Sequence, residues 1–349
     1  MNSNFNLNNL VRKNIAELKP YSSARDEFKG LKEDMVFLDA NENPYPSEVN
    51  RYPDPYQTKV KEKISQIKQL PIENMLLGNG SDEILDLIFR SFCEPGIDNC
   101  ISLPPTYGMY KVLAGINNIE NREVLLNHEF QPDVTAILNE VNENTKLIFF
   151  CSPNNPTGNI MERERIQKIL ENFNGIVLID EAYIDFSETD SWLNSLQDYP
   201  NLIVTQTFSK AYGMAAIRLG MCFASSEIIN ILNKIKPPYN VNNLTQTEAL
   251  KKLSDFNLVQ SQVFEIKQEK QSLSKVLLEI EYIAKIYKSE ANFILIEVDD
   301  ANKRYQQLLD LGIVVRNRTN QPLCNNCLRL SVGTPQENAQ LLKALKEIE

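Results

Sequence analysis

The sequence contains one histidine and one tryptophan among its 349 residues. The histidine, His128, stands in a polar stretch that predicts a loop. A triad-type nucleophile needs a histidine as its base, so this composition disfavours that chemistry. It also excludes metal sites built from several histidines, and we expect no metal.

Long apolar runs and basic runs are missing as well. No stretch approaches the ~20 apolar residues of a membrane-spanning helix, and the N-terminus lacks the charged-then-apolar pattern of a signal peptide. The net charge is -10 with acids and bases interspersed, which disfavours binding to a nucleic-acid backbone. We therefore expect a soluble cytoplasmic protein that acts on small molecules, with no nucleic-acid or membrane partner.

The cysteines do not have the pattern of a disulfide framework. There are six, they are scattered, and Cys100 and Cys151 lie in apolar runs, which favours reduced thiols. Cys324 and Cys327 form a single CxxC without a second pair. An incidental pair in a loop is favoured there over a zinc or redox site.

What the sequence does have is an alternation of apolar runs and helical patterns between residues 75 and 236. Strands are predicted over 75–77, 100–103, 146–151, 175–179, 202–205 and 220–224, and helices over 84–92, 161–173 and 227–236. This alternation predicts an α/β fold with a mainly parallel, doubly wound sheet.

The flanking regions differ in pattern. The polar residues 1–34 predict an arm that needs another surface to order it. A short strand over 35–38, a proline-rich loop over 45–55 and a charged helix over 58–69 follow. After Pro237-Pro238 the predictions are a largely helical stretch over 244–287, strands over 293–298, 312–316 and 327–332, and helices over 303–311 and from 335. We therefore predict an arm (1–34), a large domain (35–236) and a small α+β domain (237–349).

Two neighbouring apolar runs end in residues that carry chemistry. The first ends in Asp180 and then Tyr183, and the second leads into Ser209 and Lys210. In open α/β sheets ligands bind outside the carboxyl ends of the strands, so these side chains are predicted to share a crevice. Pyridoxal 5'-phosphate needs a Schiff-base lysine and an acid that faces its pyridine nitrogen. The alternative is that Asp180 is a helix cap or an exposed turn residue.

A second feature predicts an anion site. Gly78-Asn-Gly80-Ser81-Asp82 joins a predicted strand to a helix, and free N–H groups at a helix start attract anions. Arg218 and Ser209 could complete a site for a phosphate dianion. An ordinary turn remains the alternative, because neither GxGxxG nor GxxxxGK[ST] is present.

Other residues at predicted strand ends are candidates with open alternatives. Tyr107 could stack on a flat cofactor or simply pack in the core. Residues 152–158 place two amides at the end of a buried strand, where an amide N–H can donate to a phenolate oxygen. Arg329 and Arg316 lie in or after apolar strands, where an arginine usually has an anion, unless the position is a solvated edge.

The segments 152–158, 180–183 and 209–210, with Arg218, resemble those of fold-type I pyridoxal-phosphate aminotransferases. Narrower segments resemble the histidinol-phosphate aminotransferase family: 20–25, 38–42, 51–53, 80–83, 92–96, 104–110 and 328–334. The resemblance runs from about Leu10 to the C-terminus.

The resemblance implies roles for individual residues. Lys210 would form the Schiff base, Asp180 would pair with the pyridinium nitrogen, and Asn155 and Tyr183 would contact the ring oxygen. Tyr107 would stack on the cofactor ring. The cofactor phosphate would be held by Ser81, Asp82, Ser209 and Arg218, with Tyr52 reaching in from a second subunit. The residues implied for the substrate are Arg329 and Arg316 on its anionic group, with Tyr21 and Asn41 closing the site.

The implied reaction exchanges the amino group between L-histidinol phosphate and 2-oxoglutarate. A homodimer with shared active sites is expected, on the premise that Tyr52 and the arm have no partner in their own domain. The alternatives within the fold are an aromatic or broad-range aminotransferase and a threonine-phosphate decarboxylase. A ligand-sensing regulator would need a DNA-binding module, for which the ~30 residues before the first strand are too few and too poor in basic residues.

Overall fold

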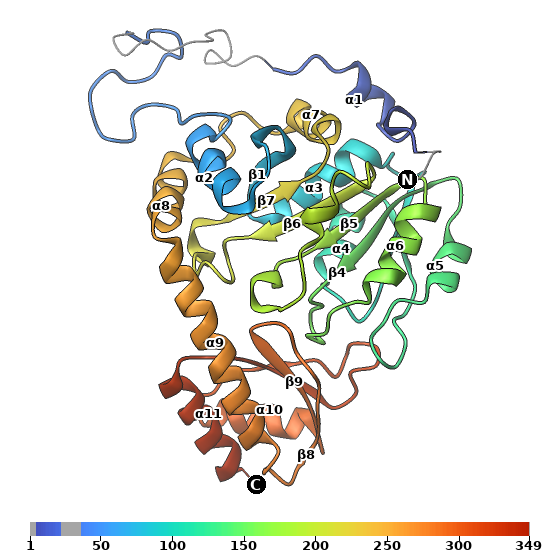
Figure 1. Ribbon diagram of the computed structural model, residues 1–349, viewed down its shortest axis with the longest axis vertical. Coiled ribbons are helices and arrows are strands. Elements are labelled where there is room, and N and C mark those ends of the chain that lie inside the picture. Colours follow the sequence, from blue (N-terminus) through green and yellow to red (C-terminus); the bar gives the residue numbers. More distant parts are fainter. Residues whose placement is uncertain (1–4, 22–35, 349) are drawn as a thin grey trace.

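The computed structural model describes residues 5–21 and 36–348, and its largest element is a seven-stranded sheet (Figure 1). The strand order is β1-β7-β6-β5-β4-β2-β3. Strand β7 is antiparallel to both of its neighbours, and the other pairs are parallel. The bounds are β1 Met75–Asn79, β2 Asn99–Ser102, β3 Glu120–Glu123, β4 Thr145–Cys151, β5 Ile176–Asp180, β6 Leu202–Thr207 and β7 Leu219–Phe223. The predicted α/β fold with a mainly parallel, doubly wound sheet is confirmed.

Helices cover both faces of this sheet because its strands point apolar side chains alternately to either side. In β4, Ile148 and Phe150 pack on one face, whereas Leu147 and Phe149 pack on the other. The first face is covered by α2 Thr58–Lys68, α5 Val134–Glu140 and α6 Arg163–Asn172. The second face is covered by α3 Ser81–Phe92, α4 Met109–Ile116 and α7 Ser226–Ile235.

A smaller antiparallel sheet of four strands lies beyond the large one, at the red end of the chain in Figure 1. Its order is β10-β11-β9-β8, with bounds β8 Ile283–Ile286, β9 Phe293–Val298, β10 Arg316–Asn317 and β11 Cys327–Ser331. The helices after the large sheet are α8 Asn243–Ser254, α9 Phe256–Leu277, α10 Ala301–Asp310 and α11 Pro335–Glu347, of which α10, α11 and the end of α9 pack on the small sheet. The 3-10 helices of the described residues are η1 Leu7–Asn9, η3 Ile72–Asn74, η4 Ile184–Phe186, η5 Trp192–Ser195 and η6 Ala215–Ile217.

The long helix α9 runs from the large sheet to the small one (Figure 1). Val259, near its start, belongs to the core of the large sheet, and Leu273 and Leu277, near its end, belong to the core of the small sheet. Helix α8 packs beside α2. The division at residue 237 stays a prediction, with α8 and the start of α9 serving as the connection.

Some local predictions were wrong. Residues 283–286 form strand β8 within the stretch predicted as helical, and of the strand predicted over 312–316 only Arg316 is in β10. Residues 36–38 form no strand, while Met35 lies outside the described residues. The predicted domain start at residue 35 and the arm segment 22–34 lie outside them too.

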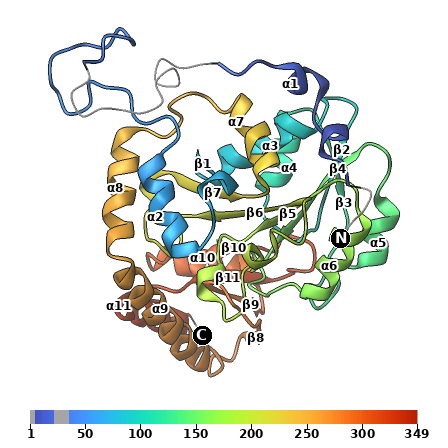
Figure 2. The ribbon, with the colours of Figure 1, turned by 45° about the horizontal axis from the view of Figure 1, so that its top comes forward.

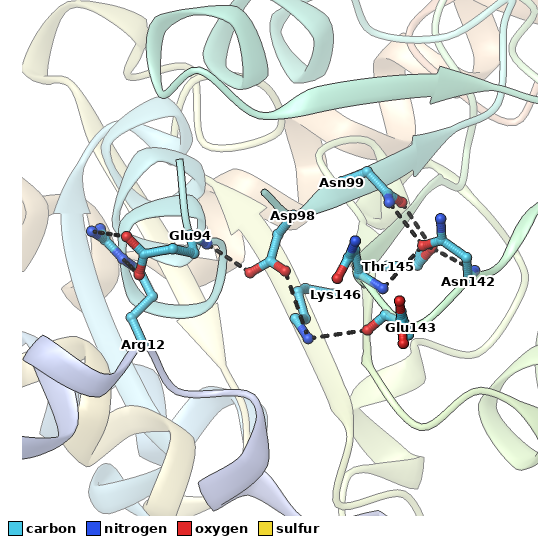
Figure 3. Close-up of polar contacts among 9 residues, drawn as sticks. Arg12, Glu94, Asp98, Asn99, Asn142, Glu143, Thr145 and Lys146 are labelled. Carbon is cyan, nitrogen blue, oxygen red and sulfur yellow. Dashed lines mark hydrogen bonds and ion pairs between the residues drawn. The ribbon is translucent and has the colours of Figure 1, made fainter. Parts of the chain in front are cut away.

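The N-terminal segment packs on its own chain (Figure 3). Leu10, Val11 and Ile15 are buried in the core on the α3 side. The Arg12 guanidinium pairs with Glu94 at 3.1 Å and donates to the carbonyl of Arg90 at 3.0 Å. The premise that the arm has no partner in its own domain is therefore wrong for residues 5–15, because their apolar side chains pack against the side of the sheet that α3 and α7 cover.

Residues 36–53 form a loop, much of which stands away from the body of the molecule in two views (Figures 1 and 2), while Tyr52 near its end packs against Tyr239. Val36, Leu38 and Tyr45 are exposed on it. Among the described residues, none of the helices has both the length and the apolar character that crossing a membrane requires.

Candidate active site

The carboxyl ends of β4, β5 and β6 open into a cavity of about 550 Å³. The small sheet supplies part of its wall through β10 and β11. The cavity brings together eleven of the fourteen predicted site residues: Ser81, Asp82, Tyr107, Asn155, Asp180, Tyr183, Ser209, Lys210, Arg218, Arg316 and Arg329. This grouping follows from parallel strands whose carboxyl ends meet at one edge.

Lys210 lies in the turn that follows β6. The turn is held by the Ser209 N–H, which donates to Thr207 Oγ1 at 3.1 Å, and by the Gly213 N–H, which donates to the Lys210 carbonyl at 3.0 Å. The Nζ atom of Lys210 lies 5.6 Å from the centroid of the Tyr183 ring. Partial burial, and then the charge of Arg329, lower the pKa of Lys210. The neutral amine, which is the nucleophilic form, is thereby favoured.

Asp180 ends β5 and is only 3% exposed. Its Oδ2 accepts a hydrogen bond from the Tyr110 hydroxyl at 2.9 Å, and its Oδ1 accepts one from the Ala182 N–H at 3.1 Å. Burial raises the pKa of Asp180 to about 6, and these two hydrogen bonds oppose the rise. The described residues give this carboxylate no ion pair, so a protonated ring nitrogen would suit it as a partner.

Ser209 and Arg218 lie beside the N-terminus of α3, and we call these groups together the candidate α3 anion site, or α3 anion site. Arg218 lies 3.5 Å from Ser209 Oγ and 3.8 Å from Asp82 Oδ2. A Cβ on Gly80, whose φ is +80°, would lie 2.6 Å from Arg218 Nη2, and one on Gly220 would lie 2.4 Å from the Ser81 nitrogen. Glycine at both positions lets the guanidinium and the helix N–H groups converge. A phosphate dianion fits this donor set.

Aromatic residues line the wall near Asp180. The Tyr107 hydroxyl donates to Asp82 Oδ1 at 3.1 Å, and its ring stands edge-on to that of Tyr110, with centroids 5.6 Å apart. Tyr110 is itself stacked on Phe149 at 4.8 Å. The Tyr110 ring therefore supports Tyr107 while its hydroxyl holds Asp180. Sequence reasoning did not select Tyr110, which lies one helical turn beyond Tyr107.

Of the two amides predicted to face the crevice, only one does. Asn154 is buried and donates to the carbonyl of Pro105 at 2.8 Å and to Thr157 Oγ1 at 2.7 Å, so it holds the loop together. Asn155 lines the cavity and accepts a hydrogen bond from Arg329. Burial raises the pKa of Tyr183, so its hydroxyl stays protonated and can donate a hydrogen bond.

Three arginines form the cavity wall on the side of the small sheet. Arg316 in β10 is the cross-strand partner of Arg329 in β11. Arg318, which sequence reasoning did not select, follows two residues after Arg316 and also lines the cavity. We call Arg316, Arg318 and Arg329 the arginine cluster. Burial, and then the charge of Arg318, lower the pKa of Arg329 to about 10.

Three predicted site residues lie outside the cavity within a single chain. Tyr52 stacks on Tyr239 with centroids 4.5 Å apart, and it lines a separate groove together with Asn41. Tyr21 is exposed. The chain alone does not bring these three residues to the cavity.

Comparisons with known proteins agree in both sequence and fold. A model of the aminotransferase class I and II family matches residues 34–345. The chain is 66% identical over 345 residues to histidinol-phosphate aminotransferase of Christiangramia forsetii, with 99% of each chain covered. It is 59% identical over 343 residues to the Flavobacterium johnsoniae enzyme of the same name, with 98% of each covered.

Solved structures share the fold at lower identity. The histidinol-phosphate aminotransferase from Clostridium acetobutylicum has a TM-score of 0.79 and 24% identity, and the match covers 86% of this chain and 91% of that one. L-threonine-O-3-phosphate decarboxylase from Porphyromonas gingivalis has a TM-score of 0.73 and 19% identity, with 86% and 91% covered.

Proposed function

Because the chain belongs to the class I and II aminotransferase family, we propose that it exchanges the amino group between L-histidinol phosphate and 2-oxoglutarate, giving imidazole-acetol phosphate and glutamate in histidine biosynthesis. The proposal is supported by the relatives at 66% and 59% identity, which are matched over nearly their full length. Full-length matches to enzymes also argue against a ligand-sensing regulator.

The single structural observation behind this proposal is that one cavity holds a lysine, a buried acid and two separate groups of anion-binding residues. Pyridoxal 5'-phosphate is the cofactor of this family, and when bound it supplies the electron sink for the carbanion at the substrate Cα. The α3 anion site would hold the cofactor phosphate, and Asp180 would hold the ring nitrogen. The arginine cluster is then left for the anionic end of a substrate.

The proposed roles follow from the positions of the side chains. Lys210 Nζ would form the covalent link to the cofactor and, once released by the substrate amine, would take the proton from the substrate Cα. Asn155 and Tyr183 would orient the ring oxygen, and Tyr107 would cover the ring face. Arg316 and Arg329 would hold the substrate phosphate in one half-reaction and a carboxylate of glutamate or 2-oxoglutarate in the other.

The test is the visible spectrum of the holoenzyme during addition of amines. Histidinol phosphate should remove the absorption band of the lysine-bound cofactor, while tyrosine and phenylalanine should leave it in place. An equal response to all three amines would indicate a broad-range aminotransferase. Release of carbon dioxide from threonine phosphate would indicate the decarboxylase, whose fold this chain also shares.

We also propose a homodimer in which the loop over 36–53 brings Tyr52 to the cavity of the second subunit. The exposed Val36, Leu38 and Tyr45 support this assembly, because such side chains on one loop are typical of an interface. Sedimentation should give a dimer, and a fully active monomer would contradict the proposal.

A cytoplasmic location is proposed from the six cysteines, all of which are free thiols.

A further inference from the structure

Arg318 is held firmly at the cavity wall by its backbone. Its N–H donates to the carbonyl of Cys327 at 2.8 Å, and its carbonyl accepts from the Gln321 N–H at 2.8 Å. Cys324 in the same turn and Cys327 at the start of β11 are fully buried. The backbone of Arg318 is thus fixed to β11, the strand that also carries Arg329.

Arg318 is half-buried, and part of its guanidinium group lacks a hydrogen-bond partner. Its Nε is buried without a hydrogen-bond partner, and the same is true of Arg329 Nε. Arg329 otherwise donates to a neutral amide, Asn155. The described residues form no ion pair with any member of the arginine cluster. Buried guanidinium N–H groups without acceptors are costly, so their persistence indicates an anionic ligand.

The carboxylates of the cavity do not supply this charge. Asp82 lies beside Arg218 and accepts from Tyr107, and Asp180 accepts from Tyr110 and Ala182. Both carboxylates therefore have partners at the proposed cofactor site and do not neutralise the arginine cluster. The cavity is lined by four arginines and one lysine against these two acids. A dianion at the α3 anion site would still leave the arginine cluster without a counter-charge.

The two anions that the proposed reaction brings to this cluster differ in charge and in oxygen atoms. A phosphate monoester presents three terminal oxygens and nearly two negative charges at neutral pH, whereas a carboxylate presents two oxygens and one charge. Two guanidinium groups can satisfy a carboxylate. A third one finds a free acceptor only when the ligand has a third oxygen.

We propose that Arg318 determines substrate specificity by binding the third oxygen of a phosphate monoester, so that the arginine cluster prefers this end group over a carboxylate. The inference rests on the proposed function, because the two half-reactions of that function supply the two anions. It adds a residue to the substrate site that neither the sequence pattern nor the resemblance selected.

The experiment compares the two half-reactions of the Arg318→Gln holoenzyme. With histidinol phosphate, kcat/KM should fall about 10- to 100-fold, as expected for the loss of a hydrogen bond between charged groups. With glutamate, it should change less than about threefold, because two arginines suffice. Arg318→Lys, which keeps the charge but loses the planar fork, should lie between the wild type and Arg318→Gln.

Asn320→Ala is the matched control, since Asn320 is exposed in the same turn and does not line the cavity. It should leave both half-reactions unchanged. A second measurement is the thermal stabilisation of the holoenzyme by added inorganic phosphate. In the holoenzyme the cofactor already fills the α3 anion site, so the added phosphate reports on the arginine cluster. Phosphate should stabilise the wild type and Asn320→Ala, and should stabilise Arg318→Gln much less.

Equal losses in both half-reactions, or no loss in either, would overturn the role of Arg318. A wild type that ignores histidinol phosphate would instead overturn the proposed function. In that case the phosphate measurement still decides about Arg318, because it requires no turnover. If Arg318→Gln fails to fold, the same comparisons with Arg318→Lys decide the question.

Discussion

The hydrogen bond from Tyr110 to Asp180 leads to a prediction about cofactor binding. Tyr110→Phe removes the hydroxyl that donates to Asp180 Oδ2 at 2.9 Å and leaves the stacking on Phe149 and the edge contact with Tyr107 in place. Asp180 then keeps the Ala182 N–H as a donor at 3.1 Å. Because hydrogen bonding stabilises the ionised form, its loss raises the pKa of Asp180 further.

The size of the effect follows from the charge on the acceptor. A hydrogen bond to a charged group contributes about 1.5–3 kcal/mol, which corresponds to roughly one to two pKa units. The pKa of Asp180 is already raised to about 6 by burial. In the variant apoenzyme the loss of the Tyr110 hydrogen bond should raise it further by that amount. In the proposed site the ring nitrogen of the cofactor would be held as a pyridinium, which needs the ionised carboxylate.

The sign of the pH dependence separates this mechanism from simple damage to the site. Below the raised pKa, binding must first ionise Asp180. Because the wild-type carboxyl is itself about half protonated near pH 6, cofactor affinity there should fall about 5- to 50-fold. Well above that pKa, the carboxylate is ionised before binding in both proteins, so the affinities should converge. A loss of affinity that stays constant with pH would refute the reasoning.

The assay is equilibrium binding of pyridoxal 5'-phosphate to the apoenzyme, followed by the fluorescence of the single tryptophan, Trp192. Tyr282→Phe is the matched control. Its hydroxyl also makes a buried hydrogen bond, to the carbonyl of Leu345 at 2.9 Å, but it lies in the core of the small sheet. This variant should bind the cofactor like the wild type at every pH.

Three further predictions concern the same cavity. Lys210→Ala should abolish turnover and the visible band of the lysine-bound cofactor, and normal turnover in this variant would remove the lysine from the mechanism. Asp180→Asn should stabilise the apoenzyme by up to about 3 kcal/mol at pH 8, because a carboxylate with a raised pKa destabilises the fold above that pKa. Thermal melts should show this gain in stability shrinking as the pH falls below 6. Gly80→Ala should cost about 1–2 kcal/mol of stability and weaken cofactor binding, because φ is +80° and the new Cβ meets Arg218, whereas Gly115→Ala, with open space around it, should melt at or above the wild-type temperature.

The strands that the sequence predicted well are those buried on both faces. β4, β5 and β6 are continuous apolar runs because helices cover both sides of them. β3, with the sequence Glu-Asn-Arg-Glu, was not predicted. It lies at the edge of the sheet and forms by backbone pairing with β2, so its side chains need not be apolar. β8 was missed for the same reason, as an edge strand that follows a long charged helix.

The candidate site shows the same division between local and tertiary information. Asp180 could be selected because it directly follows an apolar run, and Lys210 because it lies just beyond the strand that holds the next apolar run. Tyr110 could not, since a buried tyrosine on a helix reads as ordinary core, and its contact with Asp180 joins residues 70 positions apart. Arg318 stands in a polar turn, where an arginine normally faces solvent. Only the packing of β10 and β11 against the large sheet places it in the cavity.

The two ends of the cavity therefore differ in how they are built. The α3 anion site and Asp180 lie on the large sheet, where the backbone positions are set by buried parallel strands. The arginine cluster lies on the small sheet, at the edge pair β10–β11, and reaches the cavity from the other side. A cofactor that remains bound can be held by the first set throughout the cycle. In the proposed reaction, substrates of different lengths and charges would exchange at the second set. The choice between phosphate and carboxylate would then depend on the arginines of β10, β11 and the turn between them.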